Sequence, residues 1–444
     1  MGLSRLARSA PFTAAAAGVL ALAGGAAGLA ACAALVGFPD VPDEISAGDG
    51  GGAHHDGDPN GTHDARADAV RDARGDSRHD AVDHAEAQPP DAPVLDSSHP
   101  IDSGHDAGSC QHAADGGGCI VPPSCQGTTR YGLSDCGSQN DDDCCATLLV
   151  PGGQYSRTFT SGPTGPGSEM NTAFVSAFRL DKYPVTVGRF AQYVTFRDEG
   201  GQNPALGSGK HTHLNGGSGL ANIDQGTPEG GSMYEAGWQI GWSLPALLPS
   251  SIIGWNKLLE CAAPENSWQV PSAQDNLPIN CVGWTEAYAF CIWDGGFLPS
   301  ETEWEYAAVG GANELQYPWG MTPPGTTNSY AIFSDQFHGP SPDAAAGTTN
   351  LAPVGYAPLG VAQWGQLDLV GEVSQWTVDA YAPSYPAGAC IDCAAAPPDP
   401  SLARQRVVRG SGFQVALASA QARNAGAPES QAPAYGFRCA RTPE

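Results

Sequence analysis

The fold of this 444-residue chain is decided by residues 277–311, which run LPINCVGWTEAYAFCIWDGGFLPSETEWEYAAVGG. Cys281 to Trp284 form a short apolar run that predicts a buried strand, and Thr285 is placed to cap a helix. The tripeptide Asp294-Gly295-Gly296 predicts the end of that helix, because glycine adopts the left-handed backbone that closes helices.

Ser300 and Glu303 have the spacing of a capping box, in which each side chain satisfies a free backbone amide at the start of a helix. Trp304, Ala307 and Ala308 would give this second helix its buried face. Residues 277–311 therefore predict two helices that follow one buried strand.

Elements upstream extend this pattern. Thr186 can cap a helix whose buried face holds Phe190, Tyr193 and Val194. The segment Val150 to Gly153 predicts the first strand and turn of the main domain.

Together these stretches resemble the formylglycine-generating enzyme (sulfatase-modifying factor) family, on seven blocks in family order. The blocks are Tyr183 to Val194, Pro278 to Gly311, Tyr317 to Gly320, Pro353 to Gly355, Gly365 to Trp376, Arg409 to Phe413, and Gly436 to Arg441. The resemblance implies an α+β fold of the C-type-lectin type over residues 148–444, irregular and rich in loops, with two main helices.

Catalytic members of this family hold copper(I) through two cysteines that follow the Arg-Gly-Gly-Ser-Phe block. Here those positions fall on Val415 and Ala420. Because an aliphatic side chain cannot coordinate copper(I), which prefers thiolates, we do not expect copper at this place.

The family also has calcium sites, built from main-chain oxygens and carboxylates, the ligands that a hard cation prefers. The resemblance places one at Asp368, Gly371, Val373 and Gln375, and Asn328 with Ser329 would begin another. Gln375 replaces an expected glutamate, and hydrogen bonds alone are the alternative account of this loop.

A second branch of the family uses iron bound by a His-x3-His-x-Glu motif, which this sequence lacks. His211 and His213 form its only His-x-His, which a metal can use when both rings face one side of a strand. With no third ligand evident and glycine and serine around it, we expect a solvated loop there.

The first 31 residues resemble a bacterial lipoprotein signal peptide. Arg5 and Arg8 precede a run of alanine, glycine, valine and leucine that ends in Leu29-Ala30-Ala31-Cys32. We expect cleavage before Cys32, acylation of its thiol, and export to the outer membrane or cell surface. A plain secretory signal or a retained helix is the alternative.

Residues 32–109 predict a disordered tether. From Asp40 to Ser109 there are 17 acidic residues and 4 arginines, a net charge of −13 out of −27 for the whole chain. This composition buries too little apolar surface to fold. Seven interleaved histidines suggest weak metal scavenging, and a solvated linker is the simpler interpretation. No basic face is visible, so we do not expect a nucleic-acid partner.

Thirteen cysteines in an exported chain predict disulfides. Six lie in a cysteine-rich segment at residues 110–147, where we expect a three-disulfide module. Cys390 and Cys393 form a CxxC, either disulfide-bonded to each other or to partners elsewhere, or acting as a redox or metal pair. A bond between Cys281 and Cys439 is our single predicted pairing in the main domain.

Two functions fit these features. The first is a non-catalytic recognition or scaffolding domain on the cell surface, whose partner is an envelope protein or glycan. Trp238, Trp242, Trp255 and Trp268 would then either stack on the ligand or belong to the core. The second is a metal-dependent oxidoreductase that modifies a cysteine of an exported protein through a relocated site.

Overall fold

The computed structural model describes residues 121–127, 131–157, 171–223, 233–261, 265–268, 275–339, 350–385, 390–396, 402–417 and 419–443. All of them belong to the compact unit Asp96–Glu444. The predicted signal peptide, the acylated Cys32, the tether, Cys110 and Cys119 lie outside the described residues.

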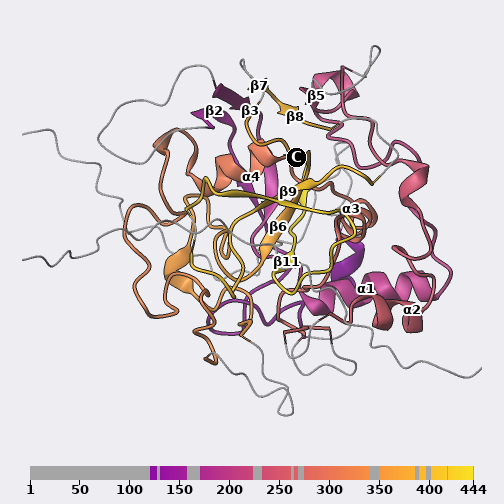
Figure 1. Ribbon diagram of the computed structural model, residues 1–444, viewed down its shortest axis with the longest axis horizontal. Helices are drawn as coiled ribbons and strands as arrows, with labels where there is room; N and C mark the ends of the chain where they lie inside the picture. Colours follow the sequence, from indigo (N-terminus) through magenta and orange to yellow (C-terminus); the bar gives the residue numbers. More distant parts are fainter. Residues whose placement is uncertain are drawn as a thin grey trace, which may run out of the picture. The chain divides into compact units, whose positions relative to one another are not determined.

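The fold is α+β, irregular and rich in loops, as the resemblance implies (Figure 1). Four α-helices occur among the described residues: α1 (Val187–Asp198), α2 (Ile252–Leu258), α3 (Trp284–Trp293) and α4 (Glu301–Ala308). The 3-10 helices are η1 (Pro123–Cys125), η3 (Asn215–Gly217), η4 (Ile240–Trp242), η5 (Gly311–Asn313) and η7 (Pro358–Gly360).

The strands are short and form small sheets. They are β1 (Thr147–Val150), β2 (Gly153–Ser156), β3 (Thr172–Val175), β4 (Phe178–Asp181), β5 (Ala221–Asn222), β6 (Ser374–Ala380), β7 (Cys390–Ile391), β8 (Cys393–Ala394), β9 (Arg406–Arg409), β10 (Arg423–Gly426), β11 (Tyr435–Gly436) and β12 (Ala440–Arg441). Their orders are β10-β9-β6-β11, β1-β4-β12, β2-β3-β7 and β5-β8.

The sheet built on β6 is the centre of the fold. Every residue of β6 is buried. Helices α3 and α4 pack against it, and both lie beside it in Figure 1. Strand β9 pairs with β6 in antiparallel register, from Gln375 opposite Arg409 to Ala380 opposite Arg406. This sheet therefore positions the segment that follows Arg409.

The predicted helix starts are confirmed in two of three cases. Thr186 caps α1, accepting from the Arg189 amide at 3.2 Å. The capping box at Ser300 and Glu303 is complete. The expected cap at Thr285 is wrong, because α3 begins at Trp284 with Gly283 as its N-cap. A Cβ at Gly283 would lie 2.8 Å from the Pro428 carbonyl oxygen, so the chain passes too closely there for a side chain.

The predicted strand from Cys281 to Trp284 is also wrong. Cys281 has a φ of 57°, in the left-handed region, which breaks the extended backbone that a strand requires. The run is nevertheless buried, as its apolar residues predict.

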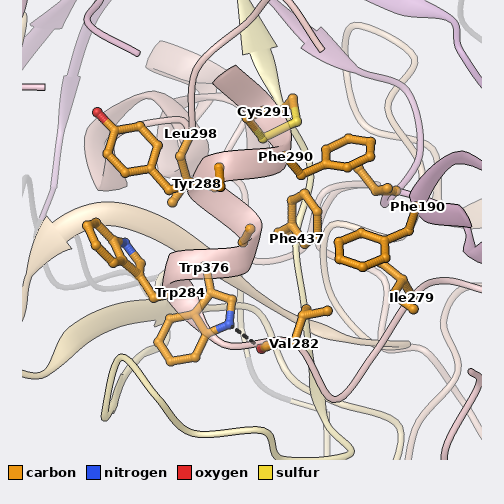
Figure 2. Close-up of a cluster of buried hydrophobic side chains, with 14 of the residues drawn as sticks. Phe190, Ile279, Val282, Trp284, Tyr288, Phe290, Cys291, Leu298, Trp376 and Phe437 are labelled. Carbon is orange, nitrogen blue, oxygen red and sulfur yellow. Dashed lines mark hydrogen bonds between the residues drawn. A yellow bond between two sulfur atoms is a disulfide. The ribbon is translucent and has the colours of Figure 1, made fainter. Parts of the chain in front are cut away.

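Aromatic side chains fill the space between α1 and α3 (Figure 2). Phe190 stacks on Phe290 with ring centroids 5.6 Å apart, and Phe437 meets Phe290 edge-on at 5.4 Å. The indole of Trp376 donates to the Val282 carbonyl oxygen at 2.9 Å. Edge and offset contacts of this kind stabilise a core beyond the area they bury.

Residues 195–270 lie between the first two family blocks, and we call them the insertion. The tryptophans of the insertion belong to this core. Trp238 and Trp255 have no exposed surface, and Trp242 and Trp268 are 3% and 7% exposed. Because their faces are covered, they are unavailable for stacking on a ligand, and the core alternative is the correct one.

The described disulfides correct the predicted pairing. Cys439 is joined to Cys291, and Cys281 is joined to Cys261, so no Cys281–Cys439 bond exists. Cys291 lies on the face of α3 that meets the chain beside β12, with 5.4 Å between its Cα and that of Cys439. Cys281 precedes the N-terminus of the same helix and so lies at the end opposite Cys291.

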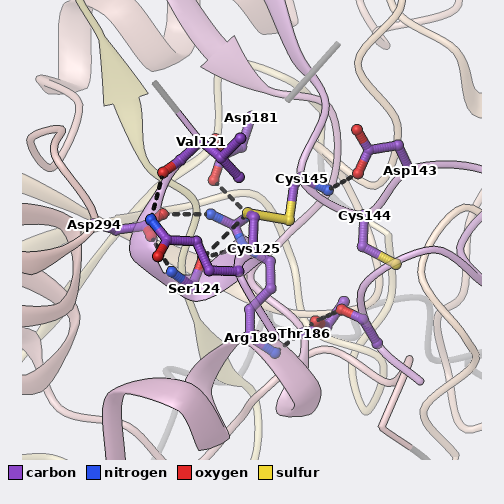
Figure 3. Close-up of a disulfide and its surroundings, with 12 residues drawn as sticks. Val121, Ser124, Cys125, Asp143, Cys144, Cys145, Asp181, Thr186, Arg189 and Asp294 are labelled. Carbon is purple, nitrogen blue, oxygen red and sulfur yellow. Dashed lines mark hydrogen bonds and ion pairs between the residues drawn. A yellow bond between two sulfur atoms is a disulfide. The ribbon is translucent and has the colours of Figure 1, made fainter. Parts of the chain in front are cut away.

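The described part of the cysteine-rich segment packs into the main domain. It contains the Cys125–Cys145 and Cys136–Cys144 disulfides. Its residue Ser124 accepts from Arg189 Nε at 3.0 Å and donates its amide to Asp294 Oδ1 at 2.9 Å (Figure 3). This segment therefore covers a buried charge cluster rather than standing apart.

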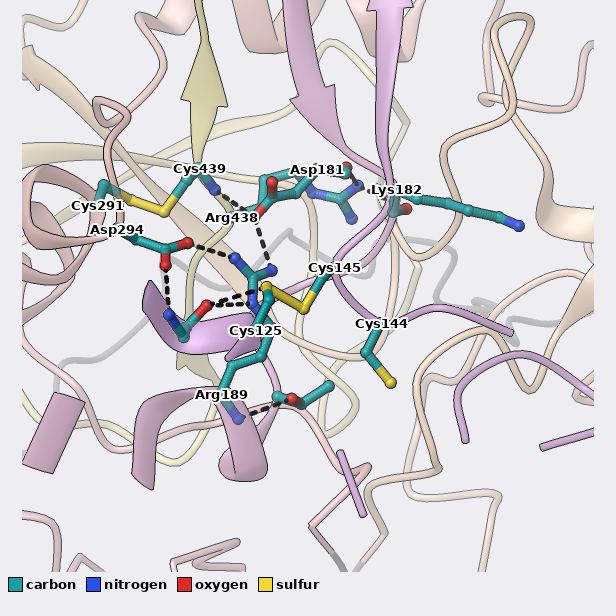
Figure 4. Close-up of polar contacts among 12 residues, drawn as sticks. Cys125, Cys144, Cys145, Asp181, Lys182, Arg189, Cys291, Asp294, Arg438 and Cys439 are labelled. Atoms are coloured by element: carbon teal, nitrogen blue, oxygen red, sulfur yellow. Dashed lines mark hydrogen bonds and ion pairs between the residues drawn. A yellow bond between two sulfur atoms is a disulfide. The ribbon is translucent and has the colours of Figure 1, made fainter. Parts of the chain in front are cut away.

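That cluster, which we call the charge ring, consists of Arg189, Asp181, Arg441 and Asp294. Figure 4 shows Arg189 with Asp181 and Asp294. Arg189 donates to Asp181 at 2.9 Å and to Asp294 at 2.7 Å, and Arg441 pairs with the same two carboxylates. All four side chains are fully buried. Burial alone would raise the pKa of Asp181, but the charges of Arg189 and Arg441 outweigh it and lower that pKa.

No helix among the residues that the structure describes is both long and apolar enough to cross a membrane.

The charge ring predicts a large effect of one neutralising substitution. Asp294→Asn leaves Arg189 and Arg441 with half of their buried counter-charge, so we expect a loss of about 3–5 kcal/mol in the free energy of unfolding. Glu199→Gln, on an exposed residue at the end of α1, is the matched control and should change stability by less than about 0.5 kcal/mol. Urea unfolding with the disulfides intact measures both, and equal stabilities would contradict the prediction.

Glu286 on α3 predicts a pH dependence. Burial raises the pKa of this carboxyl from 4.5 to about 8. The folded state thus binds the proton more tightly than the unfolded state, and the stabilisation present below pH 4.5 is lost as the pH rises through 8. We expect Glu286→Gln to exceed the wild type in stability at pH 8 but not at pH 5. Urea unfolding at both pH values tests this, and parallel pH profiles for the two proteins would count against it.

Candidate functional site

The segment between β9 and β10 is where the family's copper ligands would stand. Val415 is half exposed, and its amide donates to the Gly412 carbonyl oxygen at 3.3 Å. Ala420 is fully buried, and its amide donates to the Gln316 carbonyl oxygen at 2.8 Å. The backbone is therefore held in place at both positions, but neither side chain offers a ligand atom.

A replacement thiol is not found among the described cysteines. All ten of them form disulfides. Cys390 and Cys393 are bonded to each other and are 1% exposed, which makes the CxxC a local disulfide. A relocated copper site on these two residues would require that this bond first be reduced.

A buried ionic network lies behind the same segment. Arg409 pairs with Glu301 at 3.0 Å and with Glu305 at 2.9 Å, and Arg423 pairs with Glu301 at 2.7 Å. Tyr385 donates its hydroxyl to Glu305 at 2.9 Å. Burial raises the pKa of Glu305, and Arg409 offsets only part of that rise. Since acids and bases are paired here, the network anchors β9 and β10 to α4.

The predicted calcium loop brings Asp368 and Gln375 together. Gln375 Nε2 donates to the Asp368 carbonyl oxygen at 2.7 Å. Gln375 Oε1 accepts from Trp304 Nε1 at 2.8 Å and from Arg438 Nε at 2.7 Å. Both lone pairs of that oxygen are therefore used, and Gln375 does not fit as a calcium ligand in this arrangement.

The same loop carries two buried carboxyl groups, those of Asp368 and Glu372. Burial raises the pKa of Asp368 to about 6. Burial also raises the pKa of Glu372 well above its ordinary range, and the charge of Asp368 raises it further. Asp368 Oδ2 accepts from the Gly355 amide at 2.6 Å, and Glu372 Oε1 accepts from the Ala352 amide at 2.9 Å. Burial therefore favours the neutral form of both carboxyls. Glu372 was missed by sequence reasoning, although it stands inside the 365–376 block.

Gly371 and Val373 lie in the same loop, Gly371 with a φ of 90° against Ile332. The second predicted site is placed separately, in the turn before Tyr330. Asn328 Oδ1 is buried and has no hydrogen-bond partner within the described residues. Ser329 Oγ lies 3.1 Å from the Thr327 hydroxyl.

The His-x-His motif is not a solvated loop, so that expectation is wrong. His211 is fully buried. Its Nδ1 lies 3.0 Å from Glu235 and its Nε2 lies 3.1 Å from Glu303. Burial alone would lower the pKa of His211, but the charges of Glu303 and Glu235 outweigh it and raise the pKa to about 10. Glu235 comes from the insertion, where no local pattern identifies it, and Glu303 was recognised only as a helix cap.

The fold and these positions define the class of the protein: an α+β domain with the scaffold of a formylglycine-generating enzyme. A family model described as "Sulfatase-modifying factor enzyme 1-like domain" matches residues 134–443. This chain belongs to that family.

The chain is also similar to individual proteins of known name. The chain is 29% identical over 314 residues to the formylglycine-generating enzyme of Thermomonospora curvata, covering 67% of this chain and 93% of the relative. It is 33% identical over 193 residues to the mouse "Inactive C-alpha-formylglycine-generating enzyme 2", covering 40% of this chain and 55% of that protein. Among solved structures, PvdO from Pseudomonas aeruginosa aligns with a TM-score of 0.42 at 19% identity, covering 71% of this chain and all of PvdO.

Two cysteines placed at positions 415 and 420 should let the protein bind copper(I). Val415→Cys combined with Ala420→Cys supplies two thiolates, and we expect the double variant to bind about one more equivalent of copper(I) than the wild type. Competition with a chromophoric copper(I) chelator measures the difference. The histidines of the tether are present in both proteins, so any copper they bind does not change that difference. The single variant Val415→Cys is the control, since one thiolate holds copper(I) weakly. Tight binding by the wild type itself would show that copper has another site.

Proposed function

We propose that this protein is a non-catalytic recognition or scaffolding domain of the formylglycine-generating-enzyme-like family, displayed on the outer membrane or cell surface. One observation carries the proposal: Val415 and Ala420 stand at the two copper positions, and every described cysteine is already in a disulfide. A domain that keeps the scaffold and lacks the ligands is suited to binding rather than to oxidation.

Three further features support this proposal. A relative of the chain is named as inactive, so loss of the chemistry has a precedent in the family. The lipobox-like ending at Cys32 supports a lipid anchor in the membrane, and residues 32–109 have the composition of a tether. The net charge of −27 disfavours a nucleic-acid partner, and we propose an envelope protein or a glycan instead.

Calcium belongs to the same proposal. We place it at Asp368 with the main-chain oxygens of Gly371 and Val373, and with Glu372 in place of Gln375. The support is the pair of buried carboxylates whose pKa values are raised. When bound, the ion would neutralise both and stiffen the loop.

The calcium site predicts a thermal shift. We expect millimolar Ca²⁺ to raise the melting temperature of the wild type and to leave that of Asp368→Asn unchanged, because the variant lacks one of the two charges. Differential scanning fluorimetry with Mg²⁺ as the ionic control measures this. If Ca²⁺ does not change the melting temperature of the wild type, the loop is held by hydrogen bonds without an ion.

Catalysis is tested directly. The full chain is incubated with copper(I), air and a cysteine peptide of the sulfatase type, and the mass of the peptide is followed. We expect no formation of aldehyde, while a catalytic relative converts the peptide under the same conditions. Conversion would overturn the proposal and favour the alternative function, a metal-dependent oxidoreductase that modifies a cysteine of an exported protein.

The anchor is tested separately. In a Gram-negative host, the wild type should fractionate with the outer membrane, and Cys32→Ala should leave that fraction because it lacks the acylated thiol. Equal distribution of both proteins would exclude lipid anchoring, without bearing on catalysis.

A further inference from the structure

We propose that this protein forms a two-fold dimer through an uncharged, apolar surface around Val415, so that the partner of this surface is a second copy of the chain. The surface, which we call the uncharged face, is built from residues 315–334, 351–367 and 410–422. The proposal goes beyond the recognition function, since self-association is measured in the same way whether or not the protein forms an aldehyde.

The three stretches of the uncharged face contain no acidic residue, no basic residue and no histidine. Charged residues make up 15% of the whole chain, so stretches of this combined length would ordinarily hold several of them. The centre of a protein–protein interface is depleted of charged residues in the same way. The composition therefore indicates a surface that is suited to contact with another protein.

Large apolar side chains are exposed on all three stretches. Five of them have between 43% and 55% of their surface exposed. Single exposed side chains of this kind are normal on a protein, whereas a group of them in one region marks an interaction site. The five residues are Met321, Tyr356, Leu359, Val361 and Val415.

Backbone contacts place the three stretches side by side. The Ser334 amide donates to the Val415 carbonyl oxygen at 3.0 Å. The Leu359 amide donates to the Ser329 carbonyl oxygen at 3.1 Å. The stretch 315–334 therefore touches both of the others, and the exposed side chains belong to one region of the surface.

Charged groups border this region. Glu314 and Asp335 stand immediately before and after the stretch 315–334, and both are partly exposed. An apolar centre surrounded by a polar rim is the usual arrangement of a protein–protein interface. The uncharged face has this arrangement along its longest stretch.

The aromatic rings favour a protein over a glycan as the partner of this face. Tyr317 and Trp319 stack with 3° between their planes and 5.0 Å between their centroids, and Tyr330 lies 5.3 Å from Trp319. These rings pack on one another, which leaves less of their faces for stacking on a sugar. Most of the strongly exposed side chains of the face are aliphatic, and these suit an apolar protein surface better than the hydroxyl groups of a glycan.

A second copy fits this face because its matching surface is the same face. In a two-fold dimer one patch meets itself, so two uncharged, apolar surfaces come together without opposing like charges. The whole chain carries a net charge of −27, and contacts between copies at other places would more often oppose like charges. The lipid anchor proposed at Cys32 would hold the copies on one membrane and raise their local concentration.

Sedimentation equilibrium of the purified full chain, in a density-matched detergent that keeps a lipid-anchored protein in solution, tests the proposal. We expect the wild type to form dimers at protein concentrations of about 10–100 µM. Leu359→Asp places two like charges in the interface, one from each copy, and should weaken dimerisation by about tenfold or more. Ile253→Asp is the matched control and should leave dimerisation unchanged. Ile253 is 78% exposed on α2, and the orange loops of residues 315–360 lie on the opposite side of the molecule (Figure 1).

Val415→Asp repeats the test from a different stretch of the face, and the melting temperature of each variant shows whether it is folded. A wild type that stays monomeric at about 100 µM would overturn the proposal. A dimer that folded Leu359→Asp and Val415→Asp leave as strong as before would also overturn it, because its interface would lie elsewhere.

A photo-reactive amino acid at position 359 tests the same face without adding a charge. Illumination of the full chain carrying p-benzoylphenylalanine there should join two copies of the chain. Mass spectrometry should then find the cross-links within residues 315–334, 351–367 and 410–422. Cross-links between copies at other segments alone would contradict the two-fold arrangement.

Discussion

The structure depends on the charge ring of Arg189, Asp181, Arg441 and Asp294. These residues come from β4, α1, the end of α3 and β12, so the ring joins the neighbouring elements β4 and α1 to two elements more than 100 positions further along the chain. Ions buried in this way are tolerated only as a complete set, because each one left without its partner carries an uncompensated desolvation cost. The Cys291–Cys439 bond ties together two of the same elements. Ser124 covers the ring from the cysteine-rich segment, which explains why that segment belongs to the domain.

Helix α4 also connects separate parts of the domain, because its acidic residues contact two different segments. Glu303 faces His211 of the insertion, whereas Glu301 and Glu305 face Arg409 at the end of β9. One short helix therefore holds both the insertion and the segment where copper ligands stand in catalytic relatives. At Gly410, with a φ of 76°, a Cβ would meet the Leu369 carbonyl oxygen at 2.6 Å, so this turn still requires glycine although the cysteines that follow it in such relatives are absent. Packing therefore requires a glycine at position 410 whether or not copper ligands follow it.

What the sequence predicts well is local. The capping box at Ser300 and the Thr186 cap concern backbone groups within three residues of the cap, so spacing alone identifies them. The family blocks fix the α+β fold for the same reason, since each block is a short element. What the sequence misses is long-range. The Cys281–Cys439 pairing failed because the partner of Cys439 is set by how α3 packs on the end of the chain, and Cys291 lies 148 positions away in sequence. The burial of His211 was missed because its two partners lie 24 and 92 positions away.

The insertion has both local features that its sequence predicts and long-range contacts that it does not. Its composition alone leaves open whether it closes over the site as a mobile element or forms part of the core. Trp238 and Trp255 are buried within the main hydrophobic cluster, and His211 is held between a carboxylate of the insertion and one of α4. Any opening of the described part of the insertion would expose indole rings to water and separate a buried ion pair, both of which are costly. The described part of the insertion is therefore a fixed wall of the domain.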